Sequence, residues 1–250
     1  MGLTRPGLLR SLSLLVLALL YLAGGATTFQ PADSAEFLTV AATAGIAHPS
    51  GYPLYTLLGA AFTTILPFSV PQSLAILATL LTLLTLAGVF TLVHDLTRQP
   101  IVAFAATGVG GVSLHLWKHA THPEAFALLA TFAIWLTVVA FRAGDAERNE
   151  KERFRYACGY ALLTGLASSH HFTIALTFPV GVWMLWRVFF SEARLAQRGR
   201  LLALGVGLFA VGLLPYLHLV IRGANPPFGS WGKLTTFSDV IDHILRKEFG

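Results

Sequence analysis

Residues 73–93 read SLAILATLLTLLTLAGVFTLV, and no residue in this stretch carries a charge. A helix rises 1.5 Å per residue, so about 20 residues cross the roughly 30 Å hydrocarbon core of a bilayer. The apolar residues do not keep to one face, which indicates a helix surrounded by lipid. The stretch therefore predicts a membrane-spanning helix.

Similar apolar runs recur along the chain of 250 residues. Hydrophobic residues make up 55% of it and charged residues 12%, about half of the ~25% typical of soluble domains. The mean hydropathy is +0.68. We expect spans at 8–26, 73–93, 100–116, 125–141, 156–170, 172–190 and 201–221. The predicted fold is an all-α, polytopic transmembrane helix bundle of about seven spans.

The stretch 53–69 is apolar but short, and the positive-inside rule decides its place. If it stays outside the hydrocarbon and the N-terminus is cytoplasmic, 12 of the 17 basic residues are cytoplasmic and 5 are not; if it crosses, only 7 are cytoplasmic and 10 are not. The twelve are Arg5, Arg10, Arg98, Arg142, Arg148, Lys151, Arg153, Arg155, Arg187, Arg194, Arg198 and Arg200. We therefore expect a cytoplasmic N-terminus, an outer loop at 27–72 with two interfacial helices, and an outer segment at 222–250.

The composition argues against cysteine-based sites and against a nucleic-acid partner. The single cysteine, Cys158, rules out an internal disulfide and a cysteine-based zinc site. The pI near 9.7 does not indicate a nucleic-acid partner, because the basic residues lie in short loops beside apolar helices.

Acidic and imidazole groups gather on the predicted outer side. Asp33 and Glu36 follow the first span and share one helical face. They suit a general base with an orienting partner, and they equally suit a capping box that starts a helix. Both interpretations stay open, with Asp33 the first choice as base and Glu36 the second.

Three further outer segments carry candidate residues. They contain His48 and Tyr52 in HPSGYP, His122 and Glu124 in THPE, and His170 and His171 in SSHH. THPE also fits a capping box, with Thr121 as the cap. Aspartate, glutamate and histidine could ligate a metal, but their spacing is not diagnostic, so no metal and no other cofactor is expected.

Several of these motifs together resemble a known superfamily. In order they are Asp33-x-x-Glu36, Gly45-Ile46-Ala47-His48-Pro49-Ser50-Gly51-Tyr52-Pro53-Leu54-Tyr55, His122-Pro123-Glu124, Gly165 to His171, Ala224 to Gly232, and His243 to Gly250. The whole chain, 1–250, resembles the transmembrane domain of polytopic GT-C glycosyltransferases. It is most similar to a branch of unknown function whose eukaryotic members are endoplasmic-reticulum protein O-mannosyltransferases.

The resemblance implies sugar transfer, with mannose the expected sugar, from a polyprenyl-phosphate donor to a protein hydroxyl outside the cytoplasm, with inversion. It implies Asp33 as the catalytic acid, Glu36 as its neighbour, and a C-terminal domain beyond residue 250. Cations would stabilise the leaving phosphate. The candidates for that role are Arg222, Lys118, His170 and His171, with His48, Tyr52, His122, Glu124, Asn225 and Trp231 lining the site. A lipid or solute transporter, or flippase, is the alternative, although acidic and basic residues avoid the span interiors.

Overall fold

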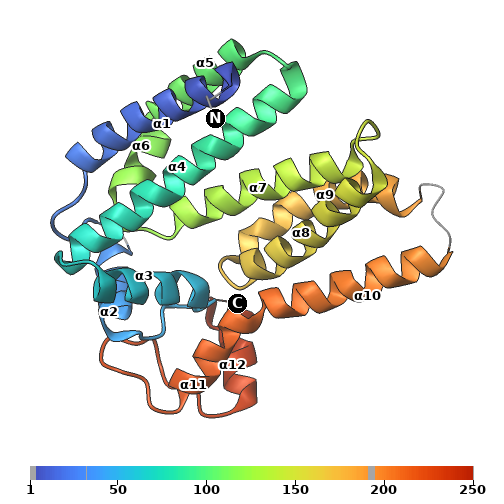
Figure 1. The fold of residues 1–250 in the computed structure, drawn as a ribbon. Coiled ribbons are helices and arrows are strands. Elements are labelled where there is room, and N and C mark those ends of the chain that lie inside the picture. The colour runs from blue at the N-terminus through green and yellow to red at the C-terminus, as the bar shows by residue number, and fades with distance from the viewer. Residues whose placement is uncertain (1–3, 32, 191–194, 250) are drawn as a thin grey trace.

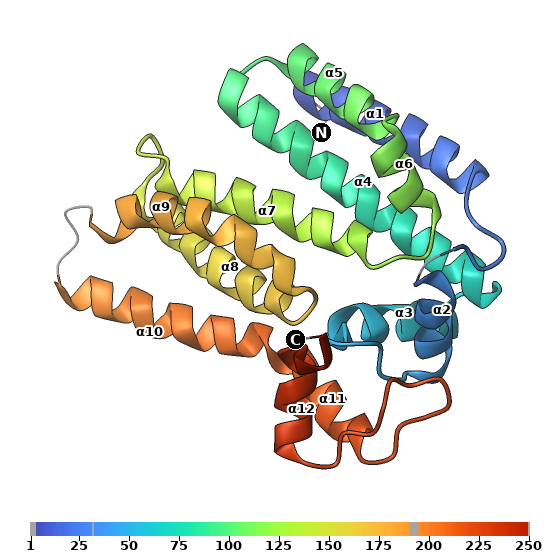
Figure 2. The same ribbon diagram turned by 180° about the vertical axis from the view of Figure 1, so that it is seen from behind.

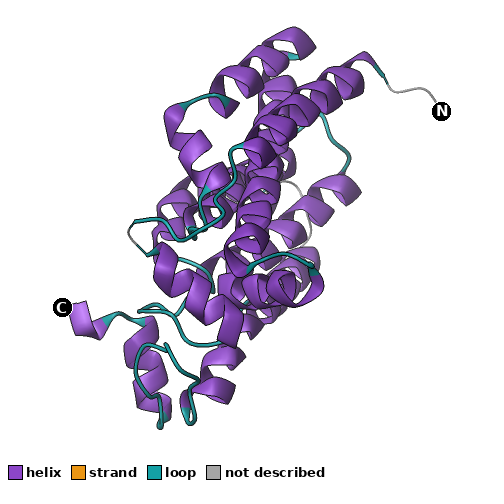
Figure 3. Ribbon diagram, turned by 90° about the vertical axis from the view of Figure 1, so that its left-hand side faces the viewer, coloured by secondary structure: helices purple, strands orange, loops and turns teal. Residues whose placement is uncertain are grey.

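The computed structural model describes residues 4–31, 33–190 and 195–249; Arg194 lies outside the described residues. Every regular element in that part of the chain is a helix (Figure 3). The α-helices are α1 (Arg5–Ala23), α2 (Ser34–Thr43), α3 (Pro53–Ile65), α4 (Val70–Thr97), α5 (Pro100–Gly111), α6 (Leu114–Thr121), α7 (Phe126–Gly144), α8 (Glu150–Ser168), α9 (Phe178–Phe189), α10 (Leu195–Gly212), α11 (Leu217–Gly223) and α12 (Phe237–Ile244). Short 3-10 turns are η1 (Phe172–Thr177), η2 (Leu214–Tyr216) and η3 (Lys247–Phe249).

The long helices form a layered bundle around α4 and α7 (Figures 1 and 2). On one side α4 packs against α1, α5 and α6, and on the other it packs against α7. Beyond α7 follow α8 and α10. Thr131 of α7 donates a hydrogen bond to the carbonyl of Leu81 in α4 over 2.8 Å. Small and hydroxyl-bearing residues often join helices in this way within a membrane.

Four short helices, α2, α3, α11 and α12, lie together at one end of the bundle, here called the α2 end (Figure 1). The end of α1, the start of α4, the turn between α6 and α7, and the ends of α8 and α10 meet them there. The predicted loops at 27–72 and 222–250 therefore share one end. At the opposite end Arg142 pairs with Asp95, with 2.7 Å between Nε and Oδ2.

The all-α polytopic fold is confirmed, whereas the count of seven spans stays a prediction. Within the described residues, four helical segments are long and apolar enough to cross a membrane: Arg5–Ala23, Val70–Thr97, Phe126–Gly144 and Arg198–Gly223. A fifth is possible if α5 and α6, bent by 68°, form one span. α8 begins with the charged run 150–155, and the expected span 172–190 is divided between η1 and α9.

α3 covers most of the doubtful stretch 53–69. Its 13 residues reach only about 20 Å, less than the hydrocarbon thickness. It lies beside α2 and contacts it. The short length and this placement agree with the expectation that 53–69 does not cross the membrane, which stays a prediction.

Candidate active site

Asp33 immediately precedes α2 and presents an exposed carboxylate there. It occupies the N-cap position, but its side chain makes no capping hydrogen bond. Instead, the hydroxyl oxygen of Ser34 accepts a hydrogen bond of 3.0 Å from the Gln30 backbone N–H. The capping-box interpretation of Asp33 and Glu36 is therefore wrong, which leaves both carboxylates for another role.

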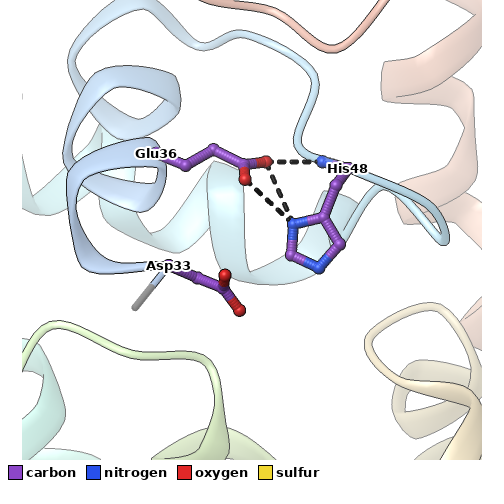
Figure 4. Close-up of side chains that lie close together, drawn as sticks. All are labelled: Asp33, Glu36 and His48. Atoms are coloured by element: carbon purple, nitrogen blue, oxygen red, sulfur yellow. Dashed lines mark hydrogen bonds and ion pairs between the residues drawn. The ribbon is translucent and has the colours of Figure 1, made fainter. Parts of the chain in front are cut away.

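Glu36 and His48 form a tight pair (Figure 4). The His48 backbone N–H donates to Oε1 of Glu36 over 2.6 Å. The His48 ring nitrogen Nδ1 lies 3.1 Å from Oε1 and 3.0 Å from Oε2. Since an ionised carboxylate only accepts, Nδ1 carries the proton of this contact. The hydrogen bond that His48 donates to Glu36 raises the pKa of His48, although burial and the charge of Arg246 oppose the shift.

Asp33 completes a cluster with this pair. One ligand atom from each of Asp33, Glu36 and His48 lies within 4.8 Å of the others. The Asp33 carboxylate and the His48 ring flank the same gap (Figure 4). Two carboxylates and an imidazole could hold a divalent metal ion, although Glu36 already accepts two hydrogen bonds from His48.

Tyr52 joins this cluster to the turn after α8. Its ring centre lies 4.9 Å from that of His48, 5.4 Å from that of His171 and 5.9 Å from that of His170. Burial raises the pKa of Tyr52 to about 12. The phenol therefore stays protonated near neutral pH and can act as a hydrogen-bond donor.

The two adjacent histidines take different positions. Nε2 of His170 lies 3.0 Å from the Ala125 carbonyl oxygen, so this nitrogen donates, and the residue is buried. Nδ1 of His171 accepts a hydrogen bond of 3.1 Å from the Thr173 backbone N–H, which leaves the proton on Nε2. Burial lowers the pKa of His171, and the nearby charges of Arg246 and His48 lower it further.

Arg246 is a member of this site that sequence reasoning missed. Its guanidinium carbon lies 4.7 Å from the centre of the Phe172 ring, and that ring stacks on His171 with 5.1 Å between centres. The charge of Arg246 acts on the pKa of His48, Tyr52 and His171 alike. The signal was its place in the segment His243 to Gly250, which had carried the resemblance without a role for this arginine.

The loop that carries His48 is held by the chain between α10 and the C-terminus. Five consecutive carbonyl oxygens, from Thr43 to Ala47, accept hydrogen bonds of 2.8–3.0 Å from that segment. The donors are the Arg222 guanidinium for Thr43 and Ala44, Nε2 of His218 for Gly45, the Trp231 backbone N–H for Ile46, and Nε2 of His243 for Ala47. We call this set the carbonyl clamp. It fixes the backbone that presents His48 to Glu36.

Two predicted phosphate ligands have other contacts in the structure. Arg222 belongs to the carbonyl clamp at the last carbonyls of α2, about 15 Å along the helix axis from Asp33. Lys118 lies 3.4 Å from Glu124, which is buried and also lies 3.3 Å from Nδ1 of His119. The His119 hydrogen bond is the main cause that lowers the pKa of Glu124.

The other predicted lining residues spread around the α2 end. The Trp231 ring centre lies 5.9 Å from that of His48, and its Nε1–H donates to Glu248. His122 contacts the Thr121 hydroxyl at 2.9 Å. Ala125, not Thr121, is the N-cap residue of α7 and α7 has no side-chain cap, so the capping box expected there is wrong. Asn225 is exposed in the loop after α11.

Comparisons with known proteins agree with the resemblance seen in the motifs. A family model described as the protein O-mannosyl-transferase TMEM260 N-terminal domain matches residues 33–194. The match includes Asp33, Glu36, His48 and His171, whereas Arg246 lies beyond it. No solved structure is significantly similar to the chain.

Two curated relatives match most of the chain. The mouse protein O-mannosyl-transferase TMEM260 is 32% identical over 221 residues, which cover 87% of this chain and 31% of the relative. The Dictyostelium discoideum protein O-mannosyl-transferase tmem260 is 27% identical over 234 residues, covering 87% of this chain and 28% of the relative. The chain thus spans less than a third of the length of either relative.

Proposed function

Because this chain belongs to the protein O-mannosyl-transferase TMEM260 N-terminal domain family, we propose that it transfers mannose from a polyprenyl-phosphate donor to a hydroxyl group of an acceptor protein. The observation that carries this proposal is the grouping of Asp33, Glu36 and His48 at one end of a bundle of apolar helices. A lipid-linked donor keeps its tail in the bilayer and its phosphate at the depth of the head groups, which suits a site at a helix end.

Asp33 is the proposed general base. A protein hydroxyl is a weak nucleophile, so a positioned group must take its proton as it attacks. The Asp33 side chain is exposed and makes no capping contact, whereas Glu36 is engaged by His48. This difference supports Asp33 as the base and assigns Glu36 to positioning His48.

The step conserves atoms and charge as follows. The acceptor oxygen bonds to the anomeric carbon of the sugar, and its proton moves to the Asp33 carboxylate. The bond from that carbon to the phosphate oxygen breaks, and the polyprenyl phosphate leaves with the electron pair. One displacement from the face opposite the phosphate inverts the anomeric carbon.

We place the α2 end outside the cytoplasm and the N-terminus inside. The support is the distribution of charge: twelve basic residues fall on the side of the N-terminus and five on the other. The Arg142–Asp95 ion pair lies at the end that this model makes cytoplasmic. The acceptor would then be a protein segment in the lumen or outside the cell.

The test is a transfer assay with the purified intact protein. Polyprenyl-phosphate mannose and polyprenyl-phosphate glucose would each be incubated with a library of peptides that contain serine and threonine, and release of polyprenyl phosphate would be measured. Transfer from the mannose donor, lost in Asp33→Asn and kept in Asp242→Asn, is the expected result. The second variant changes an acid of the same end that pairs with Lys247. Lipid movement between leaflets without sugar transfer would instead favour the flippase alternative.

A further inference from the structure

An apolar groove lies between α8, α9 and α10, far from the candidate active site. Both α9 and α10 contact α8 (Figures 1 and 2), and all three helices contribute to the walls. The volume of the groove is about 440 Å³, within the roughly 300–1,000 Å³ of small-molecule sites. We call it the α8–α10 groove; its walls include Ala157, Tyr160, Trp186, Leu201, Gly205 and Phe209.

The walls of the α8–α10 groove offer few hydrogen-bonding partners. The hydroxyl of Thr164 donates to the Tyr160 carbonyl within α8 over 2.7 Å. The Tyr160 hydroxyl lies against Gly181 of α9, where an added Cβ would collide with it. The remaining lining residues are aliphatic or aromatic. A polar occupant would lose its hydrogen bonds to water here, so an apolar chain is the occupant that fits.

The length of the groove matches one leaflet of a membrane. It runs along the first half of the candidate span Arg198–Gly223. Between Arg200 and Phe209 α10 rises about 14 Å. One leaflet contributes half of the roughly 30 Å hydrocarbon core, or about 15 Å. The groove therefore extends from the depth of the head groups to the middle of the membrane, which is the reach of one acyl chain.

Arginines surround the groove at the end of the bundle opposite the α2 end. There α8 begins, α9 ends and α10 begins (Figure 1). On each helix one arginine lies within two positions of a lining residue: Arg155 on α8, Arg187 on α9 and Arg200 on α10. All three are exposed. Within the described residues, none of the three forms an ion pair with an acid.

Other charged groups at this end have different positions. Arg153 donates to the carbonyls of Ala143 and Arg187 over 3.1 and 3.3 Å, so it joins α8 to the ends of α7 and α9. Glu150 and Glu152 lie in the first turn of α8, farther from the groove than the arginine of that helix. The charge nearest the groove is therefore positive.

We propose that the α8–α10 groove binds one acyl chain of an anionic glycerophospholipid, whose phosphate lies beside Arg187 and Arg200. Basic residues at a membrane surface attract anionic head groups, and the chain supplies contacts that the open groove lacks. The donor phosphate of the proposed reaction would lie at the α2 end, in the other leaflet. The lipid site therefore does not depend on the proposed function.

The experiment maps lipid contacts in the intact protein. Nanodiscs of phosphatidylcholine would contain increasing amounts of phosphatidylglycerol that carries a photoreactive group midway along one acyl chain. Cross-linked peptides would be identified by mass spectrometry after illumination. We expect labels within 157–164, 182–186 and 201–209, and we expect unlabelled phosphatidylglycerol to compete for them whereas added phosphatidylcholine does not.

Removal of the arginines tests recognition of the head group. Arg187→Gln combined with Arg200→Gln should raise the phosphatidylglycerol content needed for half-maximal labelling by about tenfold or more, because each basic residue near the surface contributes roughly fivefold to binding of anionic lipid. Arg5→Gln combined with Arg98→Gln is the matched control. It removes the same charge from exposed positions at the same end of the bundle and should change that content less than about twofold, within the effect of one residue.

Filling the groove tests binding of the chain. An added Cβ at Gly205 would meet only the Cβ of Ala161, at 4.0 Å, so Gly205→Phe places a ring in the groove and should abolish labelling of its walls. Gly207→Phe is the control on the same helix, where an added Cβ meets no atom within 4 Å and the groove stays open. Melting temperatures would show that the variants are folded.

Four results would overturn the proposal. Equal labelling of folded Gly205→Phe and the parent protein would show that the chain does not enter the groove. Equal competition by phosphatidylcholine would show that the head group is not recognised. Displacement by polyprenyl phosphate would assign the groove to the donor chain. Unlabelled walls in the intact parent protein would show that another segment covers them. If Gly205→Phe does not fold, the paired arginine variant decides, and unchanged labelling there overturns the site.

Discussion

Nε2 of His243 lies 3.0 Å from the carbonyl oxygen of Ala47, across 196 positions of sequence. Both residues are buried. Burial lowers the pKa of His243, so a neutral ring donates its Nε2 proton to that carbonyl. Ala47 directly precedes His48, and the contact therefore helps to fix the position of the loop that carries His48.

His243→Phe should loosen this loop without touching the reacting groups. The ring volume is retained, but the Ala47 carbonyl loses its donor, at a cost of about 1–3 kcal/mol for a buried acceptor. We expect a lower melting temperature and a lower kcat, with His243→Gln recovering part of both. Equal melting temperatures for His243→Phe and the parent protein would show that this hydrogen bond does not contribute to stability.

Asp33→Asn should separate catalysis from folding. Asparagine is as good an N-cap as aspartate, and the Asp33 side chain makes no capping bond in any case, so the melting temperature should not fall. Loss of a general base lowers the rate by roughly 10²–10⁴. The measurement is turnover at saturating donor together with donor affinity, which should be unchanged. Near-normal turnover would show that Asp33 is not the general base and that another residue takes the proton.

Glu36→Gln should shift the pH dependence of donor binding. Glu36 raises the pKa of His48, so His48 stays charged to a higher pH than a free histidine does. Binding of phosphate that depends on this charge is strong below the His48 pKa and weakens as the pH rises through it. Without the Glu36 carboxylate that transition moves to lower pH.

The measurement is the dissociation constant of polyprenyl phosphate between pH 5 and 9. The groups that face His48 and also titrate or carry charge are Asp33, Glu36, Tyr52, His171, His243 and Arg246. Glu147→Gln, at the opposite end of the bundle, serves as the control and should leave the profile in place. Coincident profiles for Glu36→Gln and the parent protein would exclude His48 as the titrating group.

Membrane orientation can be tested by labelling. In a Cys158→Ala background, Lys233→Cys and Glu147→Cys place one exposed thiol at each end of the bundle. An impermeant maleimide applied to intact membranes from the extracytoplasmic side should label position 233 at once and position 147 only after permeabilisation. The reverse order would invert the proposed topology and move the site to the cytoplasm.

Removal of metal ions by a chelator tests whether turnover requires a metal ion. Asp33, Glu36 and His48 could hold an ion, but two Glu36 contacts are already hydrogen bonds to His48. We expect that EDTA followed by dialysis leaves turnover within about twofold and does not change the melting temperature; the twofold margin is well below the 10²-fold effect of losing a catalytic group. Recovery of lost activity by added Mn²⁺ or Mg²⁺ would contradict this expectation.

The helical fold could be predicted from the sequence, but the side-chain contacts of the candidate site could not. A long uncharged run predicts a span from its own length and composition, and the distribution of basic residues placed 27–72 and 222–250 on one side. Span counting was harder: α8 carries a charged first turn and a half, and its neighbour begins as a 3-10 turn.

The side-chain contacts depend on tertiary paths that spacing does not reveal. The i, i+3 spacing of Asp33 and Glu36 fits a cap, yet Glu36 turns to His48 because the carbonyl clamp brings that loop above α2. The same clamp uses Arg222, which sequence position alone had assigned to the donor phosphate. Arg246 lies beside Phe172 only because of the way the segment after α12 folds, which its position in the sequence does not reveal.

The carbonyl clamp also has a consequence for biosynthesis. Its last member, His243, is translated 196 residues after Ala47, which at about 5–20 residues per second means a delay of roughly 10–40 s. During that interval residues 27–72 have left the ribosome, but the carbonyl of Ala47 still lacks its partner. The nascent chain can insert its early helices into the membrane long before it can position His48. Catalytic competence would then begin only when the far end of this segment arrives, and a ribosome stalled before residue 243 would leave an inserted but inactive chain.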